Sequence, residues 1–599
     1  MLKNKKIDWS KHIFIILMLA WAVIHFLVFW VYVNANSFVL TFFKFNTSTA
    51  KYEWYGLTRF KNIFNDMILG QDPIVVQNLK NSLWCFPVQN FIILPLSFFS
   101  AYFLFKKVPF SNLFRVIFFI PSMLSVVVLA MSFKFMFNAD NLMFNKIAPA
   151  EIFKSRCAEM GAELNCEMLL KLVEESSEAR YELIHNAPDT IKSDKTIWYV
   201  SGKGRKNALG NSPEDPFDSI ESLDANSHKI SAGDAVLFAR GEEFRGNCIT
   251  SISGVSYGAY GEGEKPIINA SFRNYTNDNW YCIGDDIWTC DVSFPADVGN
   301  IIFDFGKNFG YKKIKLEDVT DYLDFYSDHD KGNQVFIKLK DNPTNLFKSI
   351  EIAYNIWMFR LEQNSDIIIE NLSFINGGGH GIRGGNCNNI IVRGCEFRFI
   401  GGSYLEAFAD GTVRYGNAIE FMTGSKNITV ENCYVYEVYD SGATHQGLGY
   451  YCAKNIVFRN NLFSHCGMGS IEYWLGQGSV AKDVTYEGNI LRFAGYGFGG
   501  KQRPDKNKTA HIQGNGFLHN HIENFIIRNN IFDKSSYDII NAQSRDETLP
   551  KMENNIYIQN NGERLGSWGI VVDIPADDRA EVIVSEKWND SNAVVELVH

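Results

Sequence analysis

The sequence predicts an all-α transmembrane region of three helices joined to a larger all-β domain built from stacked coils. Three observations predict this fold class. Three long apolar runs lie within residues 1–137, and no comparable run follows them. Short apolar runs of strand length, separated by Gly and Asn, fill the rest of the chain. Six of these short runs share one eight-residue pattern, which is typical of a repeat architecture.

The predicted membrane helices span residues 12–33, 83–105 and 114–137 within a region that ends near residue 140. Each is long enough to cross roughly 30 Å of hydrocarbon. The first has no small-residue cleavage site, so we expect an anchor in the lipid bilayer rather than a removed signal peptide. Lysines precede the first helix, and Lys106, Lys107 and Arg115 fill the short second loop. This pattern predicts a plasma-membrane protein with a cytoplasmic N-terminus and an extracytoplasmic C-terminal domain.

Residues 10–140 also carry a resemblance in three segments: Tyr55–Asn62, Gln77–Leu83 and Phe114–Ser122. With these segments the region resembles the permease subunits of ABC-type sugar importers. The family usually has six spans and a cytoplasmic EAA-type loop that docks the ATPase. This chain has three predicted spans and no such loop, so it resembles a truncated permease. A transporter component with other ABC transporter subunits as partners is therefore an alternative function and not the leading one.

Residues 141–194 join the two parts. The segment 151–182 is charged and favours helix, with apolar residues at mixed spacing. We expect a linker with one or two short amphipathic helices, acting as a solvated connector.

Charge and cysteine usage exclude several functions for the C-terminal part. Residues 1–149 carry 14 Lys and Arg against 5 Asp and Glu, whereas residues 150–599 carry 43 against 62. A domain this acidic, without a basic run, is not expected to bind nucleic acid. No CxxC pair or tight Cys/His cluster is present, which argues against zinc and iron–sulfur sites. Cys395 and Cys433 occupy the same slot in two repeats, so we expect stacked, buried thiols.

The internal repeat defines the β domain. Each unit reads as strand, Asn or Gly bend, strand, and one such coil cannot bury its apolar face unless others stack on it at roughly 4.8 Å per step. Asn and Gly tolerate the left-handed bend, and Asn side chains at one bend of successive coils can form a hydrogen-bonded ladder. The six units are Ile367–Phe374, Ile390–Phe397, Ile428–Val435, Ile456–Phe463, Val484–Leu491 and Phe525–Phe532.

The opening of this domain adds a second resemblance, in Trp198–Ser201, Pro213–Phe217, Gly233–Phe238 and Arg240–Phe244. With the repeats, these motifs resemble the right-handed parallel β-helix of the pectate-lyase-like superfamily. The resemblance implies an all-β right-handed parallel β-helix over residues 195–561. It leaves the activity open, because that fold hosts lyases, hydrolases, epimerases and phage tailspikes. Alternation in Ala580–Val584 predicts a capping β-segment over residues 562–599.

A second strand register between the repeats predicts the candidate site. Aligning its segments puts one file of side chains along the outside of the helix: Arg383, Glu420, Tyr450 or Tyr451, Glu472, and His519 or His521. Because side chains alternate across a strand, Ile419 and Ile471 should face inward while Glu420 and Glu472 face outward. The two glutamates should lie two coils apart, roughly 9–10 Å.

That separation is at the upper edge of the range for an inverting glycosidase and too long for a retaining one. Glu420 and Glu472 are therefore the leading catalytic candidates, and solubilising surface glutamates are the alternative. Asp440 and His445, predicted to lie on a Gly-flanked turn, form an alternative acid–base pair, or else the Asp440 side chain only stabilises that tight turn. Arg383 either pairs with Glu420, or grips a uronate carboxylate or serves as a lyase base.

The remaining candidates would bind substrate. Trp474 offers an aromatic face on which a sugar ring can stack. Polar and aromatic residues near it on the same predicted strands are further candidates for contacts with the substrate. We assign no cofactor and no set of metal ligands. The sequence has no dense cluster of Asp and Glu of the kind that calcium-dependent lyases of this fold use, so a calcium site is unsupported. The predicted substrate-binding side chains are Gln446, Tyr451, Tyr473, Trp474, His519 and His521.

Together these patterns predict a membrane-anchored protein that cleaves glycosidic bonds of a polysaccharide or oligosaccharide, as a hydrolase or a lyase. A non-catalytic glycan-binding β-helix is the second hypothesis. In a further hypothesis, the permease fragment is vestigial and the β-helix works in the cytoplasm.

Overall fold

The computed structural model describes residues 43–46, 51–54, 148–193, 195–246, 248–405, 413–447, 451–504, 506–516, 520–543 and 549–599. The chain divides into two compact units, residues 1–140 and 141–599. In the first unit the structure describes an antiparallel hairpin of β1 (Phe43–Asn46) and β2 (Lys51–Trp54). The three predicted membrane helices lie outside the described residues. Within the described part of the chain, no helix is long and apolar enough to cross a membrane.

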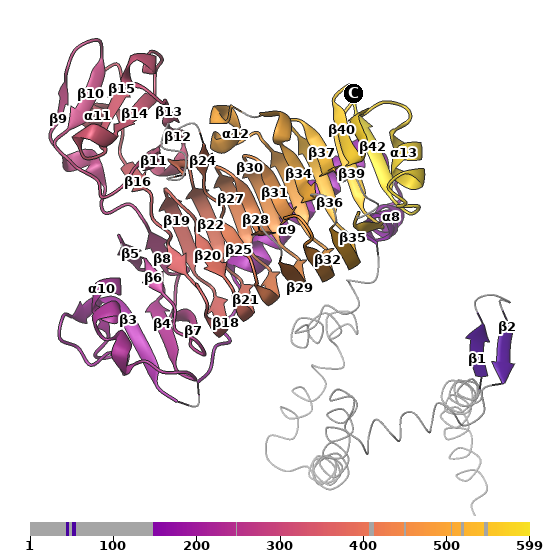
Figure 1. Ribbon diagram of the computed structural model, residues 1–599, viewed down its shortest axis with the longest axis horizontal. Helices are drawn as coiled ribbons and strands as arrows, with labels where there is room; N and C mark the ends of the chain where they lie inside the picture. Colours follow the sequence, from indigo (N-terminus) through magenta and orange to yellow (C-terminus); the bar gives the residue numbers. More distant parts are fainter. Residues whose placement is uncertain are drawn as a thin grey trace, which may run out of the picture. The chain divides into compact units, whose positions relative to one another are not determined.

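The second unit is a parallel β-helix whose central coils each contribute one strand to each of three sheets (Figure 1). Each sheet has ten strands among the described residues, and the last strand of sheet three runs antiparallel to its neighbour. Sheet one contains β3 (Ile197–Arg205), β4 (Ala235–Ala239), β7 (Ser256–Tyr260), β18 (Ser365–Glu370), β21 (Asn388–Arg393), β26 (Lys426–Glu431), β29 (Cys452–Arg459), β32 (Val480–Glu487), β35 (His521–Arg528) and β38 (Lys551–Glu553). Sheet two contains β5 (Glu243–Arg245), β8 (Ile267–Asn269), β19 (Ser373–Gly377), β22 (Glu396–Ile400), β27 (Tyr434–Val438), β30 (Leu462–Cys466), β33 (Ile490–Ala494), β36 (Ile531–Ser535), β39 (Ile556–Asn560) and β42 (Val594–Val598). Sheet three contains β6 (Ile249–Thr250), β17 (Phe359–Arg360), β20 (Ile382–Gly385), β25 (Ile419–Met422), β28 (Ser441–Gly447), β31 (Gly469–Leu475), β34 (Ala510–Gly516), β37 (Asp538–Gln543), β40 (Arg564–Gly569) and β41 (Val571–Pro575).

The predicted repeat forms the bend between sheets one and two. Its fifth residue is left-handed in all six units, for example Asn371 (φ 56°), Gly394 (φ 62°) and Asn529 (φ 55°). This is the conformation that Asn and Gly tolerate better than other residues. The predicted bends are therefore confirmed.

The hydrogen-bonded ladder forms at the sixth residue of the repeat, one position later than the bend. Asn461 donates to Asn489, Asn489 to Asn530, and Asn530 to Asn555, at 3.0–3.1 Å. Each amide also donates to a sheet-one carbonyl of the preceding coil, such as Val430 for Asn461.

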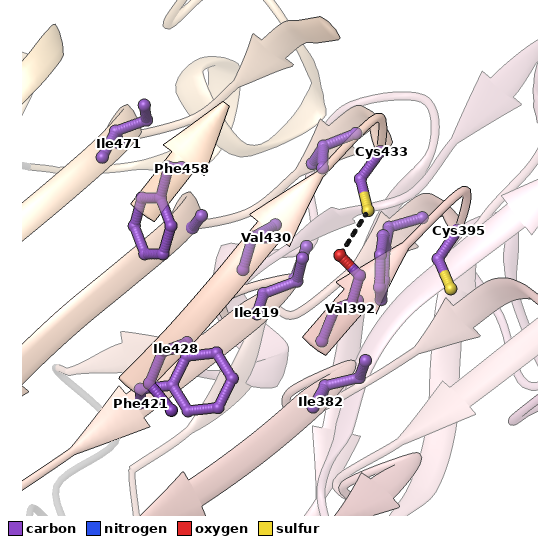
Figure 2. Packing of buried hydrophobic residues seen from close by; sticks show 14 of the residues in the cluster. Ile382, Val392, Cys395, Ile419, Phe421, Ile428, Val430, Cys433, Phe458 and Ile471 are labelled. Carbon is purple, nitrogen blue, oxygen red and sulfur yellow. Dashed lines mark hydrogen bonds between the residues drawn. The ribbon is translucent and has the colours of Figure 1, made fainter. Parts of the chain in front are cut away.

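Cysteines occupy this same slot in the two earlier coils. The thiols of Cys395 and Cys433 are free and fully buried, as predicted. Each donates to a carbonyl of the preceding coil, Ile369 and Val392 respectively, at 3.7 Å, and Figure 2 shows the second bond. A thiol thus replaces the amide in its bond to the neighbouring coil.

The core runs through the middle of the coils. Ile419 and Ile471 on sheet three face Val430 and Phe458 on sheet one, and all four are fully buried (Figure 2). The predicted inward direction of the two isoleucines is confirmed. Stacking of like residues in successive coils, such as Phe374 on Phe397 at 5.1 Å between ring centres, continues the core along the axis.

Two helices cover the outer face of sheet two. They are α8 (Pro149–Glu159) and α9 (Cys166–His185), and the Asn165 side chain caps α9 by accepting from the Met168 N–H. Leu172 and Val173 of α9 pack with Leu462 and Ile490 of sheet two. The expected helices are present, but the expectation of a solvated connector is wrong, because α9 buries an apolar stripe against the β-helix.

Residues 270–357 form an insertion between β8 and β17 that the sequence did not reveal. Its own core contains Phe325, Ile337 and Ile350. One sheet contains β13 (Tyr311–Lys312), β14 (Asp324–Asp328), β15 (Gln334–Lys338), β10 (Ile287–Cys290) and β9 (Trp280–Cys282), and the other contains β12 (Asn308–Phe309), β11 (Val298–Phe303) and β16 (Ile350–Tyr354). The insertion also contains the short helix α11 (Pro343–Leu346). Two other short helices lie outside it, α10 (Ile220–Ala225) and α12 (Phe498–Gln502).

The C-terminal end differs from the predicted all-strand cap. The segment Ala580–Glu586 is helix α13, not a strand. Ala580 and Val584, four residues apart on one face of the helix, are both buried. The parallel pairing of β42 with β39 carries the coiled architecture to residue 598.

Candidate functional site

A row of polar side chains runs along the outer face of sheet three. Cα partners in successive strands are Arg383, Glu420, Thr444, Glu472, Gln513 and Asn541, which we call the polar file. Glu420 and Glu472 lie on one face and two coils apart, roughly 9.6 Å by the strand spacing. The outward direction and shared file predicted for Arg383, Glu420 and Glu472 are confirmed.

Two positions of the file were predicted wrongly. β28 begins at Ser441, so Thr444 takes the place expected for Tyr450 or Tyr451. Tyr451 lies in the core, and its hydroxyl donates to the Trp474 carbonyl at 2.8 Å. β34 supplies Gln513 in the next coil, whereas the exposed His521 begins β35 of sheet one. Tyr450 and His519 lie outside the described residues.

The Glu420 carboxylate is 3% exposed and surrounded by donors. Its Oε2 accepts from Asn417 Nδ2 at 2.6 Å and Gln446 Nε2 at 2.9 Å, and its Oε1 accepts from Arg383 Nε at 3.2 Å. The predicted ion pair with Arg383 is present, but the alternative of an exposed, solubilising glutamate is wrong. Three donors hold the carboxylate in one position.

Aromatic and basic groups missed by the sequence reasoning complete this part of the site. His380 Nε2 lies 3.4 Å from Glu420 Oε2, and its Nδ1 accepts from the Asn417 N–H at 3.0 Å. Burial lowers the pKa of His380, so the neutral ring presents Nε2–H to Glu420. Arg383 lies over the Trp357 ring at 4.1 Å, and Tyr415 packs edge-on against His380. Trp357 and Asn417 lie outside the strands, just before β17 and β25, and Tyr415 ends the two-residue strand β24 (Arg414–Tyr415), so strand periodicity carries no signal at these positions.

Glu472 lies in a different environment, although it is equally buried at 2% exposed. The Ser441 hydroxyl donates to its Oε2 at 3.2 Å. Burial raises the pKa of Glu472 to about 8, with further contributions from the Asp440 and Glu420 charges. Asp440 accepts from Arg503 Nη1 at 2.7 Å. At neutral pH Glu472 is therefore a carboxylic acid beside a charge-paired aspartate.

The assignment of His445 as an acid–base residue is wrong. The segment read as a turn is strand β28, and its alternation turns His445 into the core, where Nε2 lies 2.7 Å from the Tyr486 hydroxyl. Burial lowers the pKa of His445 to about 3. Tyr473, predicted to bind substrate, is likewise buried and stacks on His445 at 6.4 Å between ring centres. Neither side chain reaches the outer face.

Gln446 and Trp474 lie beside the polar file on its outer face, as partners of one another in β28 and β31. Both are half-buried. Their positions suit the predicted substrate contacts, which stay predictions. Among the described residues, no three His, Cys, Asp or Glu side chains gather as metal ligands would.

The chain matches, over residues 358–491, the family model described as "Right handed beta helix region". No curated protein matches it. Among solved structures it is similar to the GH136 lacto-N-biosidase from Eubacterium ramulus, with 14% identity over 67% of this chain and 68% of that chain and a TM-score of 0.36. It is also similar to a rhamnogalacturonan lyase (11% identity, 62% and 75% covered, TM-score 0.34) and to PfbA, a surface adhesin of Streptococcus pneumoniae (12% identity, 60% and 84% covered, TM-score 0.28).

Likenesses at these identities and scores carry no argument about function. The right-handed β-helix rests on the three parallel sheets and the family model. The comparisons lend no support to the permease resemblance of residues 10–140.

Proposed function

We propose that this protein cleaves glycosidic bonds on the outer face of sheet three, with Glu472 as general acid and Glu420 as general base. The observation that supports this is the contrast between two carboxyl groups on one face. One is kept protonated by burial and neighbouring charge, and the other is fixed among donors. Pairs of carboxyl groups whose environments differ in this way are the usual acid–base arrangement of glycosidases.

In the proposed reaction Glu472 donates its proton to the glycosidic oxygen as the bond to the anomeric carbon breaks. Glu420 accepts a proton from the water that attacks that carbon from the opposite side. The strand spacing of roughly 9.6 Å is about the upper limit for an inverting pair. Asp440, adjacent to Glu472, is the alternative base. If the substrate carries a uronate, Arg383 would contact its carboxylate.

The test is a glycan screen with the full chain and its Glu420→Gln and Glu472→Gln variants. Neutral and uronic-acid polysaccharides are incubated while reducing ends and the absorbance of unsaturated products are followed. Hydrolysis of one glycan, lost in both variants, supports the proposal. The matched control is Glu523→Gln, which removes an exposed carboxylate of sheet one paired with Lys482. Full activity in either glutamate variant would eliminate the assignment.

A non-catalytic glycan-binding role is the second candidate, because the three donors that already occupy the Glu420 carboxylate oppose its taking a proton as a general base. That role predicts binding of one glycan without product release over long incubation.

Membrane anchoring and an extracytoplasmic β-helix form part of the proposal. Protease accessibility of the β-helix on intact cells tests the location. A role as a transport component instead predicts co-purification with an ATPase and a second permease subunit.

A further inference from the structure

A pocket of about 620 Å³ lies between the insertion and the β-helix, and no residue of the polar file lines it. The insertion contributes residues from the stretch 311–324. The β-helix contributes Tyr404 of β23 (Ser403–Tyr404), Arg414 of β24, and the end of α12 with Pro504. Pockets of this size, at the junction of two folded parts, are where proteins usually bind small molecules.

Hydrogen bonds fix the walls of this pocket. Gln502 of α12 accepts from the Lys312 N–H and from Arg414 Nη2, both at 3.1 Å. The Tyr404 hydroxyl donates to the Lys313 carbonyl at 3.0 Å. The insertion, β23, β24 and α12 are therefore tied to one another around the pocket, which needs no rearrangement to admit a ligand.

Two cations of the pocket have no carboxylate partner among the described residues. Arg414 is half-buried, and its Nε and Nη2 donate to neutral oxygens. Its Nη1 donates to none of the described residues. Lys501 is exposed, and its Nζ lies 5.3 Å from the centre of the Phe309 ring. A partly desolvated guanidinium without a counter-charge favours an anion in this pocket.

The other two cations of the pocket are already paired. Lys312 Nζ lies 2.5 Å from Asp297, and Lys313 Nζ lies 3.0 Å from Asp324. The pKa of Lys312 is lowered to about 7, mainly by burial and in part by the Arg414 charge, against the opposing effect of Asp297. The positive charge of Arg414 therefore reaches the floor of the pocket and is not cancelled there.

Other lining groups suit the hydroxyl groups and the ring of a sugar. Asp318 and Asp321 are exposed carboxylates that form no ion pair within the described part of the chain, and Tyr311 and Tyr322 add aromatic rings. Carboxylates accept hydrogen bonds from hydroxyl groups, and aromatic rings provide apolar faces. The two carboxylates also repel a ligand with several negative charges. The lining therefore fits one anionic group on a hydroxylated body.

We propose that this pocket binds a sugar that carries one carboxylate, either a free uronic acid or a uronic acid at the end of a glycan. Its carboxylate accepts from Arg414 Nη1 and Lys501 Nζ, and its hydroxyl groups donate to Asp318 and Asp321. This second site goes beyond the proposed cleavage on sheet three and does not depend on it.

The test is calorimetric titration of the full chain with glucuronate and galacturonate, each as the free sugar and linked to one neutral sugar. Glucose, galactose, acetate and inorganic phosphate are the comparison ligands. We expect one uronate to bind at least about 10-fold more tightly than its neutral counterpart, acetate or phosphate. Tighter binding of the free or of the linked form supports the inference in either case and identifies the source of the ligand.

Variants of the two unpaired cations separate this site from binding elsewhere. Lys501→Gln changes an exposed side chain and should weaken uronate binding about 5-fold without lowering Tm. Arg414→Gln should weaken it about 10-fold or more. The matched control is Lys348→Gln, an exposed lysine of the insertion outside the pocket lining, which should leave binding unchanged.

Four results would overturn the inference. They are binding of neither uronate, equal affinity for a uronate and its neutral counterpart, tighter binding of phosphate, and unchanged uronate affinity in Lys501→Gln.

Discussion

The raised pKa of Glu472 makes a quantitative prediction about stability. Burial raises this pKa to about 8 from its ordinary value of 4.5, so between these pH values the folded protein holds a proton that the unfolded chain has released. Stability is therefore complete below about pH 4.5, falls as pH rises through the window, and is fully reduced above about pH 8. At about 1.4 kcal/mol per pH unit, the loss is on the order of 5 kcal/mol.

Glu472→Gln keeps the shape of the protonated acid and removes the titration. The variant should match the wild type near pH 5 and exceed its stability near pH 9. For residues 141–599, an unfolding entropy of about 2.1 cal/mol/K per residue converts on the order of 5 kcal/mol into roughly 5 °C of Tm. Thermal unfolding from pH 5 to pH 9 measures the difference, with Glu523→Gln as the surface control. A Tm difference between variant and wild type that is the same at both pH values would refute a protonated Glu472.

Four further outcomes test the described site and fold. With Glu472 as general acid, kcat/KM should fall about 10-fold per pH unit above about pH 8, and initial rates from pH 6 to pH 10 check this; a flat profile contradicts the role. His445→Phe should cost about 1–3 kcal/mol, because the Tyr486 hydroxyl loses its partner, but should leave the pH–rate profile unchanged; a shifted limb would return His445 to the chemistry. Asn489→Ala removes the bonds that its amide donates to Asn530 and to the Phe458 carbonyl and the two that it accepts from Asn461, so denaturant unfolding should show a loss of about 4 kcal/mol; no loss would mean that the ladder is not stabilising. Leu172→Ala should lower the free energy of unfolding by about 2–5 kcal/mol and speed hydrogen exchange in α9. Unchanged stability and exchange would instead support the rejected expectation that this segment is a solvated connector.

The repeat could be predicted from the sequence because its signal is local. An Asn or Gly that needs a left-handed backbone, flanked by alternating apolar residues, specifies a bend between two strands wherever it occurs. The same alternation in Ile382, Ile419 and Ile471 located Arg383, Glu420 and Glu472 on the outer face.

The errors come from segments where that signal is weak. Ser441–Gly447 contains mostly small and polar residues, so its composition favours a turn over the strand that it forms. The sequence therefore places Tyr451, and not Thr444, in the polar file. Ala510–Gly516 is equally poor in apolar residues, so the alternation favours the more apolar stretch that includes His521 over the strand β34.

Burial of the two glutamates could not be foreseen, because it depends on contacts between distant parts of the chain. The groups around Glu420 come from residues 380, 383, 417 and 446, on four separate strands or corners. The pKa of Glu472 depends on the same kind of convergence, since Asp440 and Arg503 are 63 residues apart in sequence. The insertion at residues 270–357 has no repeat and was invisible to a search for periodicity.

The slot shared by Cys395, Cys433 and Asn461 makes each turn of the spiral an exchangeable module. A short side chain at this position joins two coils when it donates one hydrogen bond to a backbone carbonyl of the preceding coil, and the donor is either an amide nitrogen or a thiol sulfur. At this position, neighbouring coils then need no matched residues, only this one hydrogen bond from one coil to the next. A spiral built on such a rule can gain or lose turns, and so lengthen or shorten its outer wall, without redesign of the turns that remain.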